Sequence, residues 1–299
     1  MKIIDVDFTN EPQEDFSNPE VRRSIDNALS EYEERRKKNL ADNKIIPPII
    51  DGKTYDASHG NIITVFDPAD TARALGKVTF ADQECIERAC SVARDAYFRS
   101  MQNFASPSRF DDWIKEKKAV VQEYIQITRE ERYDIATEMI NEVSKSQKGA
   151  FAEIEETIDF GEIYLRLVDD VFALYRYQPK LRAESNYCRN KPRGPSLLIK
   201  AWNYAFSLPS EAVLASYITG CPPLLKPAPQ SSLVGYRVVD IMRRAIKKVG
   251  ADPGMVAYLP GDRDVGEALV RHPFIANITL TGSLKAGKRI NRVAAEVLD

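Results

Sequence analysis

The sequence predicts an α/β protein built on a doubly wound parallel sheet. From residue 196 onward, short apolar runs alternate with longer segments in which apolar residues recur at helical spacing. This alternation is typical of βαβ units, in which helices connect parallel strands. Polar residues follow the apolar runs, where each predicted strand ends. Because parallel sheets bind ligands at the carboxyl ends of their strands, we expect a ligand site at that edge.

The predicted elements of this region alternate regularly along the chain. They are, in order, strand 196–200, helix 209–219, strand 223–226, helix 231–249, strand 255–259, helix 264–271, strand 275–280 and helix 285–298. Helix 231–249 has the clearest pattern, because apolar residues occupy one face and Gly250 follows as a C-cap. The chain contains no G-x-G-x-x-G sequence, so the usual dinucleotide fingerprint is absent.

The rest of the chain divides into segments of different pattern. An edge strand is expected at Ile45–Ile50, although Pro47 and Pro48 interrupt it. Asp82 is a plausible N-cap for a helix at 83–98. The predicted segments are an arm with a charged helix and the edge strand (1–60), strands followed by helices (61–176), a projecting β-hairpin (177–195) and the α/β core (196–299).

The hairpin and the arm are expected to contact another subunit. Residues 177–193 alternate loosely around a turn-like Glu-Ser-Asn, as a β-hairpin does. A projecting hairpin leaves a strand edge exposed, and such an edge pairs readily with another chain. We therefore expect the hairpin and residues 1–20 to pack on a partner subunit in a homo-oligomer.

An acidic helical segment at 150–176 allows two interpretations. Its carboxylates could serve as paired acid and base groups. An apolar stripe at helical spacing instead favours a helix with most of its acids on the solvent side. The carboxylates in question are Glu153, Glu155, Glu156, Asp159, Glu162, Asp169 and Asp170, and the stripe consists of Ile154, Ile158, Leu165 and Val168. We favour the solvated face.

Composition excludes several classes of function. Hydrophobic residues make up 43% of the 299 residues, which is enough for a sizeable core. The net charge of -2 gives no case for nucleic acid or an anionic membrane as a partner. No apolar run approaches the roughly eighteen residues of a membrane span. The acidic start lacks the apolar core of a signal peptide, so the cytoplasm is the expected location.

The cysteines do not predict a metal centre. The four cysteines form no C-x-x-C pair, and two histidines offer little further ligation. Single cysteines fit a reducing compartment. Cys85 and Cys90 lie five positions apart on one predicted helix and are expected to pack in the core.

Three polar motifs follow the predicted strands. Asn203 either shapes a turn or donates its amide to a developing oxyanion. Lys226 either faces solvent or donates to ribose hydroxyls. The turn from Thr281 through Gly282 to Ser283 opens a helix, where free amides can hold a phosphate, although many strand-to-helix turns look alike.

Together these motifs resemble the aldehyde dehydrogenase superfamily. Trp202-Asn203, Lys226-Pro-Ala, Gly266 and Thr281-Gly-Ser occur in the order and spacing found there. Within that superfamily the chain looks most like the 1-pyrroline-5-carboxylate (glutamate semialdehyde) dehydrogenases. That likeness lies in residues 9–12, 15–16, 158–160 and 259–266. The resemblance covers nearly the whole chain and implies a Rossmann-like fold, NAD as cofactor and a small-molecule aldehyde as substrate.

The resemblance also assigns roles to individual residues. Lys226 would meet the adenosine ribose, Gly266 would open the helix beside the adenine, and Ser283 would contact the pyrophosphate. Asn203 would stabilise the oxyanion that forms when a thiolate attacks the aldehyde. The positions implied for the NAD cleft are Ile199, Lys200, Trp202, Lys226, Gly266, Gly282 and Ser283.

The chain departs from the family pattern in several places. It stops at Asp299, before the family's Glu-x-Gly-Gly-Lys segment and its nucleophilic cysteine. Cys221 stands where the family usually has asparagine and is expected to be inert. Ala201 and Ala205 replace two prolines, and Pro229 stands where many members have a ribose-binding glutamate.

Three hypotheses follow. In the first, the chain is the amino-terminal part of an NAD-dependent enzyme that oxidises glutamate γ-semialdehyde to glutamate in proline catabolism. In the second, it is a catalytically silent relative that binds nucleotide or serves as an assembly subunit. In the third, it is a dinucleotide-binding module of another class, in which Lys226 and Ser283 do not face each other across a cleft.

Overall fold

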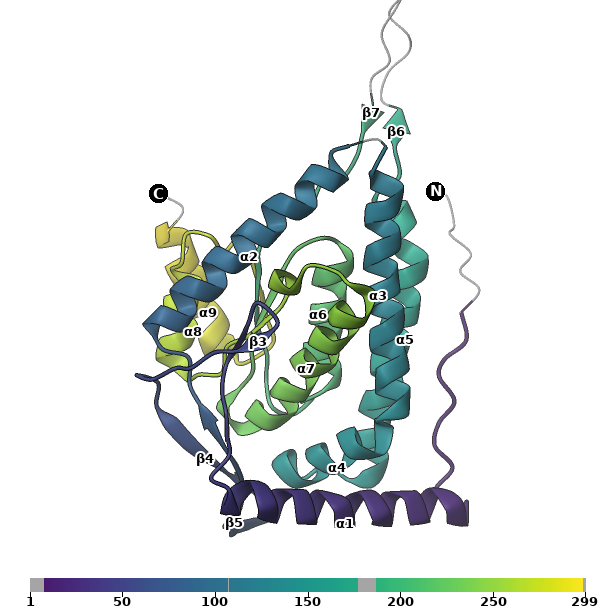
Figure 1. Ribbon diagram of the computed structural model, residues 1–299, viewed down its shortest axis with the longest axis vertical. Coiled ribbons are helices and arrows are strands. Elements are labelled where there is room, and N and C mark those ends of the chain that lie inside the picture. The colour runs from purple at the N-terminus through teal and green to yellow at the C-terminus, as the bar shows by residue number, and fades with distance from the viewer. Residues whose placement is uncertain (1–7, 107, 177–186, 298–299) are drawn as a thin grey trace, which may run out of the picture.

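The computed structural model describes residues 8–106, 108–176 and 187–297. A six-stranded sheet lies at the centre of this part of the chain (Figure 1). The strand order is β11-β8-β9-β10-β2-β3. The bounds are β2 (Ile49–Ile50), β3 (Lys53–Thr54), β8 (Ser196–Ile199), β9 (Pro223–Lys226), β10 (Ala257–Tyr258) and β11 (Asn277–Leu280). Strands β11, β8, β9 and β10 pair in parallel with their neighbours. Strand β2 pairs antiparallel with β10, and β3 pairs antiparallel with β2.

Helices cover both faces of this sheet, as the doubly wound prediction requires. In β9, Leu224 and Leu225 are both fully buried, and they belong to different hydrophobic clusters. Successive side chains of a strand point to opposite faces, so each cluster reports on one face. The cluster around Leu224 includes residues of α2 (Gln83–Phe104), α8 (Arg263–Val270) and α9 (Leu284–Val297). The fold-class prediction is confirmed.

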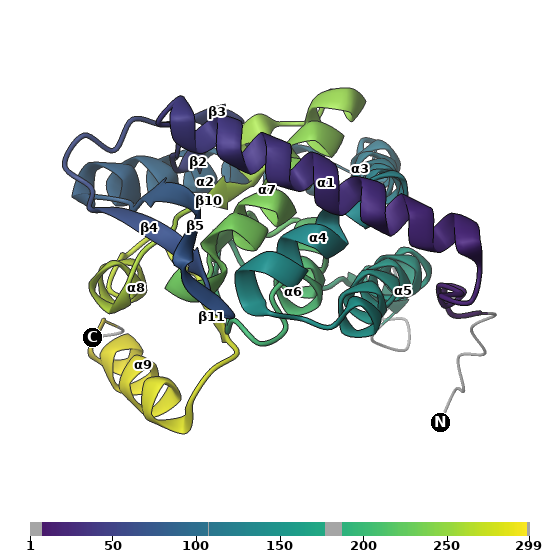
Figure 2. The ribbon, with the colours of Figure 1, turned by 90° about the horizontal axis from the view of Figure 1, so that it is seen from below.

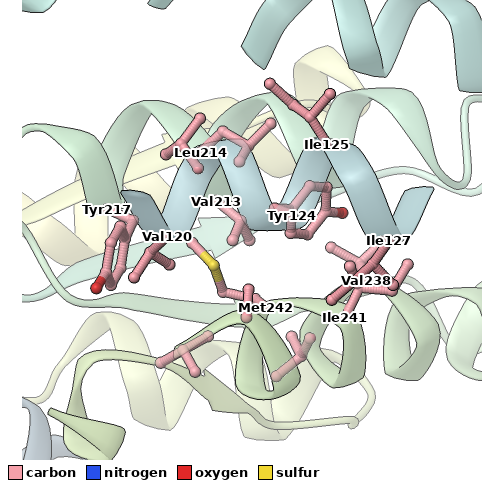
Figure 3. Packing of buried hydrophobic residues seen from close by; sticks show 14 of the residues in the cluster. Val120, Tyr124, Ile125, Ile127, Val213, Leu214, Tyr217, Val238, Ile241 and Met242 are labelled. Atoms are coloured by element: carbon pink, nitrogen blue, oxygen red, sulfur yellow. The ribbon is translucent and has the colours of Figure 1, made fainter. Parts of the chain in front are cut away.

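The larger cluster lies on the other face. It draws on α3 (Phe110–Glu130), α5 (Gln147–Val171), α6 (Ser207–Ile218) and α7 (Ser232–Val249). Figure 3 shows its centre, where Tyr124 of α3 and Met242 of α7 pack near residues of α6. The Tyr124 hydroxyl lies 2.8 Å from Ser210 Oγ, so its polar atom is satisfied inside the core.

The remaining elements frame these layers. Helix α1 (Pro19–Ala41) runs across α4 (Arg132–Val143), as Figure 2 shows. A three-stranded sheet in the order β1-β5-β4 lies beside them. Its strands are β1 (Ile45–Ile46), β4 (Ile62–Asp67) and β5 (Asp70–Thr79). In the described ranges, no helix is long and apolar enough to cross a membrane.

The predicted edge strand Ile45–Ile50 is wrong as a single element. Pro47 and Pro48 divide it into β1 and β2, which join different sheets. A proline cannot donate to a strand ladder, so the chain leaves one sheet there and enters the other. The amino-terminal segment thereby adds β2 to the central sheet.

The arm makes contacts within its own chain that the sequence does not predict. Asn10 Nδ2 donates to Asp159 Oδ2 of α5 at 2.6 Å, and Arg129 of α3 forms a 2.8 Å ion pair with Glu11. Phe16 meets Phe151 edge to face, with ring centroids 5.5 Å apart. The carboxylates of α5 and the cations of α3 therefore provide a binding surface for the arm. Its packing on a partner subunit stays a prediction.

The base of the predicted hairpin is present. Strands β6 (Tyr175–Arg176) and β7 (Tyr187–Cys188) pair antiparallel and project beyond α3 at the end away from α1 (Figure 1). Residues 177–186 lie outside the described part of the chain. Packing of the hairpin on a partner subunit likewise stays a prediction.

Candidate functional site

The parallel strands end together and form one edge. Ile199 of β8 and Lys226 of β9 are register partners, and Lys200 N donates to Lys226 O at 3.2 Å. On the other side of β8, Thr281 N donates to Ile199 O at 2.9 Å. The segments that follow β8, β9 and β11 are therefore neighbours, so the predicted site residues at 199–203, 226 and 281–283 lie along one edge of the sheet.

Lys200 is buried at this edge, with 3% of its surface exposed. Its Nζ lies 3.4 Å from Thr281 Oγ1 and 3.8 Å from Glu211 Oε2. Burial lowers the pKa of Lys200 because the charged form loses its hydration, and Glu211 opposes that shift. Tyr164 donates to the other Glu211 oxygen at 3.0 Å, which holds the carboxylate in place.

Lys226 is also buried, so the alternative of a solvent-exposed lysine is wrong. It is 5% exposed, and its Nζ donates to Pro227 O at 3.2 Å. Burial lowers the pKa of Lys226 to about 8, although the charge of Asp262 acts against this. An ammonium group has three donors, and in the described part of the chain one of them has a partner. Lys226 can therefore donate to an incoming acceptor.

Gly266 leaves room for the Lys226 side chain. It lies in the first turn of α8, and a Cβ there would stand 3.1 Å from Lys226 Cε. Asp262 caps the same helix by accepting from the amides of Asp264 and Val265. Sequence reasoning places Gly266 and Lys226 in one site, and the structure puts them within contact distance.

The Thr281–Ser283 turn opens α9. Ser283 Oγ accepts from Ala286 N at 3.2 Å, so the serine acts as a cap within its own helix. Gly282 and Ser283 are exposed. Lys200 contacts this turn through the hydroxyl group of Thr281. A free amide end beside a buried ammonium group suits an anionic ligand.

The loop after β8 carries an exposed turn. Trp202 is 50% exposed, Tyr204 is 45% exposed, and Asn203 between them is exposed as well. In residues 8–106, 108–176 and 187–297, no hydrogen bond holds the side chain of Trp202 or Asn203. The next residues, Ala205 and Phe206, are fully buried and lead into α6. The Asn203 amide is thus free to meet a ligand from solvent.

One acidic residue behind this loop lies on the other side of its helix from the one predicted. Most carboxylates of α5 are expected on the solvent side, but Glu153 is 1% exposed. Its Oε2 accepts from the amides of Phe206 at 2.9 Å and Ser207 at 3.1 Å. The signal was present, because Glu153 lies three residues after buried Ala150 and four before buried Thr157, on the same helical stripe.

None of the four cysteines is placed to act beside Asn203. Cys85 and Cys90 are fully buried in α2, as predicted, and burial raises the pKa of each thiol to about 12. Cys221 is buried and precedes β9, at the amino edge of the sheet. Cys188 is exposed on β7, in the hairpin. Within the described ranges, no group of three or more potential ligands could hold a metal ion.

A family model described as "Aldehyde dehydrogenase family" matches residues 55–299. The chain belongs to the aldehyde dehydrogenase family. This membership excludes the hypothesis of a dinucleotide-binding module of another class.

The chain is 30% identical over 295 residues to a 1-pyrroline-5-carboxylate dehydrogenase of Geobacillus sp. (strain WCH70), an alignment that covers 97% of this chain and 52% of the relative. A relative of the same name from Staphylococcus epidermidis is also 30% identical, with 98% and 53% covered.

Comparison with solved structures also finds partial coverage of longer chains. The 1-pyrroline-5-carboxylate dehydrogenase from Thermus with bound NAD superposes with a TM-score of 0.85 at 26% identity, covering 98% of this chain and 53% of that one. Proline utilization A from Bdellovibrio bacteriovorus gives a TM-score of 0.84 at 27% identity, with 98% and 29% covered. The chain thus spans about half the length of the curated relatives that it matches.

Proposed function

We propose that this chain is the cofactor-binding part of an NAD-dependent aldehyde dehydrogenase that oxidises L-glutamate γ-semialdehyde, in equilibrium with 1-pyrroline-5-carboxylate, to glutamate in proline catabolism. The observation that carries this proposal is the shared edge of the sheet along which buried Lys226, with Gly266 against it, and the Thr281–Ser283 turn lie. The names of the relatives support the substrate, and the Thermus structure with bound NAD supports the cofactor.

The residues at this edge fit a dinucleotide. Lys226 would offer ammonium donors to ribose hydroxyls, and Gly266 leaves space for the lysine side chain. The free amides at the start of α9, near Gly282 and Ser283, suit the pyrophosphate. Ile199, Lys200 and Trp202 would line the cleft between these contacts. Bound NAD would supply a hydride acceptor at this edge.

Asn203 is the proposed catalytic residue of this part. Its side-chain amide is exposed and available to donate to the oxygen of a reacting aldehyde. Such a donor stabilises the negative charge that the oxygen gains when a nucleophile adds to the carbonyl carbon. The nucleophile is a thiolate in this chemistry, and no cysteine of the chain lies at this edge. We therefore propose that thiolate and base come from residues outside this chain.

A second candidate function is a catalytically silent nucleotide-binding or assembly subunit. It is favoured by the positions of the four cysteines, none of which accompanies Asn203. Ala201 and Ala205, which replace two prolines beside the Trp202–Asn203 turn, also favour the silent subunit. For either function we propose a cytoplasmic homo-oligomer that contacts its partner through the β6–β7 hairpin.

Calorimetric titration of the purified chain with NAD tests the cofactor proposal. We expect saturable binding, with no formation of NADH when glutamate γ-semialdehyde is added, because the nucleophile is absent. Titration with a nucleotide that lacks the nicotinamide, such as ADP-ribose, serves as the control for adenosine-side contacts. No heat of binding with either ligand would contradict the proposed cofactor role.

The two candidate functions differ when a carboxyl-terminal half is supplied. We would join the chain to the second half of the Geobacillus relative and assay NADH formation with glutamate γ-semialdehyde. The proposed dehydrogenase gives an active chimera, and replacement of Asn203 with alanine lowers kcat by roughly a hundredfold, the effect of one oxyanion donor. A folded chimera that binds NAD without oxidising the aldehyde supports the silent subunit instead.

Gly266→Val is expected to weaken NAD binding without unfolding the chain. The first added carbon meets Lys226 Cε at 3.1 Å, so a larger side chain must displace the lysine tip from its place. We expect the Kd for NAD to rise roughly tenfold, through loss of one charged hydrogen bond. Gly250→Ala is the matched control for a glycine substitution, because no atom lies within 4 Å of its added carbon, although its φ of 79° adds strain. An unchanged Kd for Gly266→Val would contradict the role of Lys226.

A further inference from the structure

Two buried glutamates cap the helices that follow β8 and β9. Glu142 of α4 is 3% exposed and accepts from the amides of Leu233 and Val234, each at 2.7 Å, at the start of α7. Glu153 of α5 accepts from the two amides at the start of α6, both through Oε2. Each carboxylate thus satisfies otherwise unpaired amides at a helix N-terminus, but Glu142 uses both of its oxygens and Glu153 uses one.

Glu153 has a further contact that Glu142 does not show in the described chain. Lys145 Nζ lies 2.6 Å from Glu153 Oε1, and the same ammonium stands 4.3 Å from the centroid of the Tyr204 ring. The Lys145 side chain is 19% exposed, so solvent screens these contacts only in part. An ammonium over an aromatic face is attracted to its electron-rich ring. Lys145 therefore connects the buried carboxylate to the exposed turn.

The turn itself has few other restraints. It consists of Trp202, Asn203 and Tyr204, all exposed, between a buried Lys200 and a buried Ala205. Among the described residues, Tyr204 is the member of the turn whose side chain has a charged contact. The direction in which the Asn203 amide points thus depends on where Tyr204 is held.

We propose that Glu153 and Lys145 are positioning residues that fix the Trp202–Tyr204 turn, and through it the Asn203 amide. This role is separate from the capping of α6. The functional meaning of the turn rests on the proposed function, whereas the contact network does not.

Glu153→Gln separates the two roles. The glutamine carbonyl can still accept from the amides of Phe206 and Ser207, so the cap is kept. Its NH₂ group then faces Lys145 Nζ, and two donors cannot pair. The ammonium is released, and Tyr204 loses its partner. We therefore expect this variant to stay folded while the turn changes conformation.

Fluorine NMR of the chain labelled with 5-fluorotryptophan measures this change. The chain has two tryptophans, Trp113, which is 3% exposed, and Trp202 in the turn. Trp202→Phe assigns the two resonances. We expect Glu153→Gln and Lys145→Met to shift the Trp202 resonance and to leave that of Trp113 in place. If the pair acts as one unit, the double variant shifts the Trp202 resonance no further than Glu153→Gln alone.

Glu142→Gln is the matched control. It alters the corresponding cap on α7, which has no lysine contact in the described chain. Because Glu142 accepts one amide on each oxygen, the glutamine NH₂ group would face an amide donor, so we expect a lower urea midpoint with no movement of the Trp202 resonance. Equal shifts in Glu153→Gln and Glu142→Gln, or an unmoved Trp202 resonance in Glu153→Gln, would overturn the proposal. No nucleotide is present in this measurement, so a chain that fails to bind NAD contradicts the proposed function and not the positioning role.

Discussion

Replacing Lys226 with methionine is expected to weaken NAD binding by roughly tenfold or more. Lys226 is 5% exposed and its ammonium group has one partner in the described part of the chain, so the remaining donors are free for the ligand. A hydrogen bond to a charged group contributes roughly 1.5–3 kcal/mol, which corresponds to at least about tenfold in Kd. Calorimetric titration with NAD measures the change.

The substitution should leave the fold intact. Methionine has nearly the same length as lysine and requires no buried charge to be desolvated. We expect the urea midpoint of Lys226→Met to equal or exceed that of the wild type. Lys285→Met, an exposed lysine in the first turn of α9, controls for the loss of one positive charge near the site. If Lys285→Met weakened binding as much as Lys226→Met, general electrostatics and not the buried donor would explain the effect.

The same lysine predicts how NAD affinity varies with pH. Burial lowers the pKa of Lys226 to about 8, so the ammonium loses its proton as the pH rises through that value. If the charged form binds, the affinity is highest below pH 8 and falls above it. The apparent Kd should rise about tenfold between pH 7 and pH 9, as the charged fraction falls. Lys226→Met should flatten this part of the profile.

Leu225→Ala is expected to lower the free energy of unfolding by roughly 2–5 kcal/mol. Leu225 lies in β9, is fully buried and belongs to the larger hydrophobic cluster. Truncation removes apolar contacts and leaves a cavity between the sheet and its helices, which the surrounding close packing fills only in part. Urea denaturation followed by circular dichroism gives the change in free energy.

Leu284→Ala makes the same chemical change at an exposed site. Leu284 is 75% exposed at the start of α9, so its truncation should alter the free energy of unfolding by no more than about 0.5 kcal/mol. A similar cost for both variants would mean that Leu225 is not in a packed core. A loss in Leu225→Ala alone confirms that β9 is covered by helices.

The parallel sheet could be predicted because its signals are local. The predicted strand 223–226 has the bounds of β9, and the predicted helix 231–249 differs from α7 by one residue at its start. Both carry regular apolar spacing and clear stop signals. Ile45–Ile50 could not be predicted in the same way, because its apolar residues do not reveal which sheet each half joins. That choice depends on partners distant in sequence, since Ile45 pairs with Lys77 and Ile49 with Tyr258.

In the candidate site, too, contacts between residues distant in sequence could not be predicted. Motif order placed Asn203, Lys226 and Gly266 at one edge, since strand ends in a parallel sheet meet there. The burial of Lys226 and Glu153 was not predicted, because a charged residue is assigned to solvent unless its partners are known. Glu153 is paired with Lys145 and two backbone amides, and the amides are more than fifty residues away in the sequence.

The fold class and the family resemblance follow from local sequence patterns, because periodic apolar spacing and short motifs are properties of neighbouring residues. The partners of the buried charges, and the contacts that hold the Trp202–Tyr204 turn, are visible only in the folded chain. These depend on contacts between α4, α5 and the loop after β8, elements that meet only once the chain has folded. The stability of a buried charge is set by all of its partners together, and no local pattern records them.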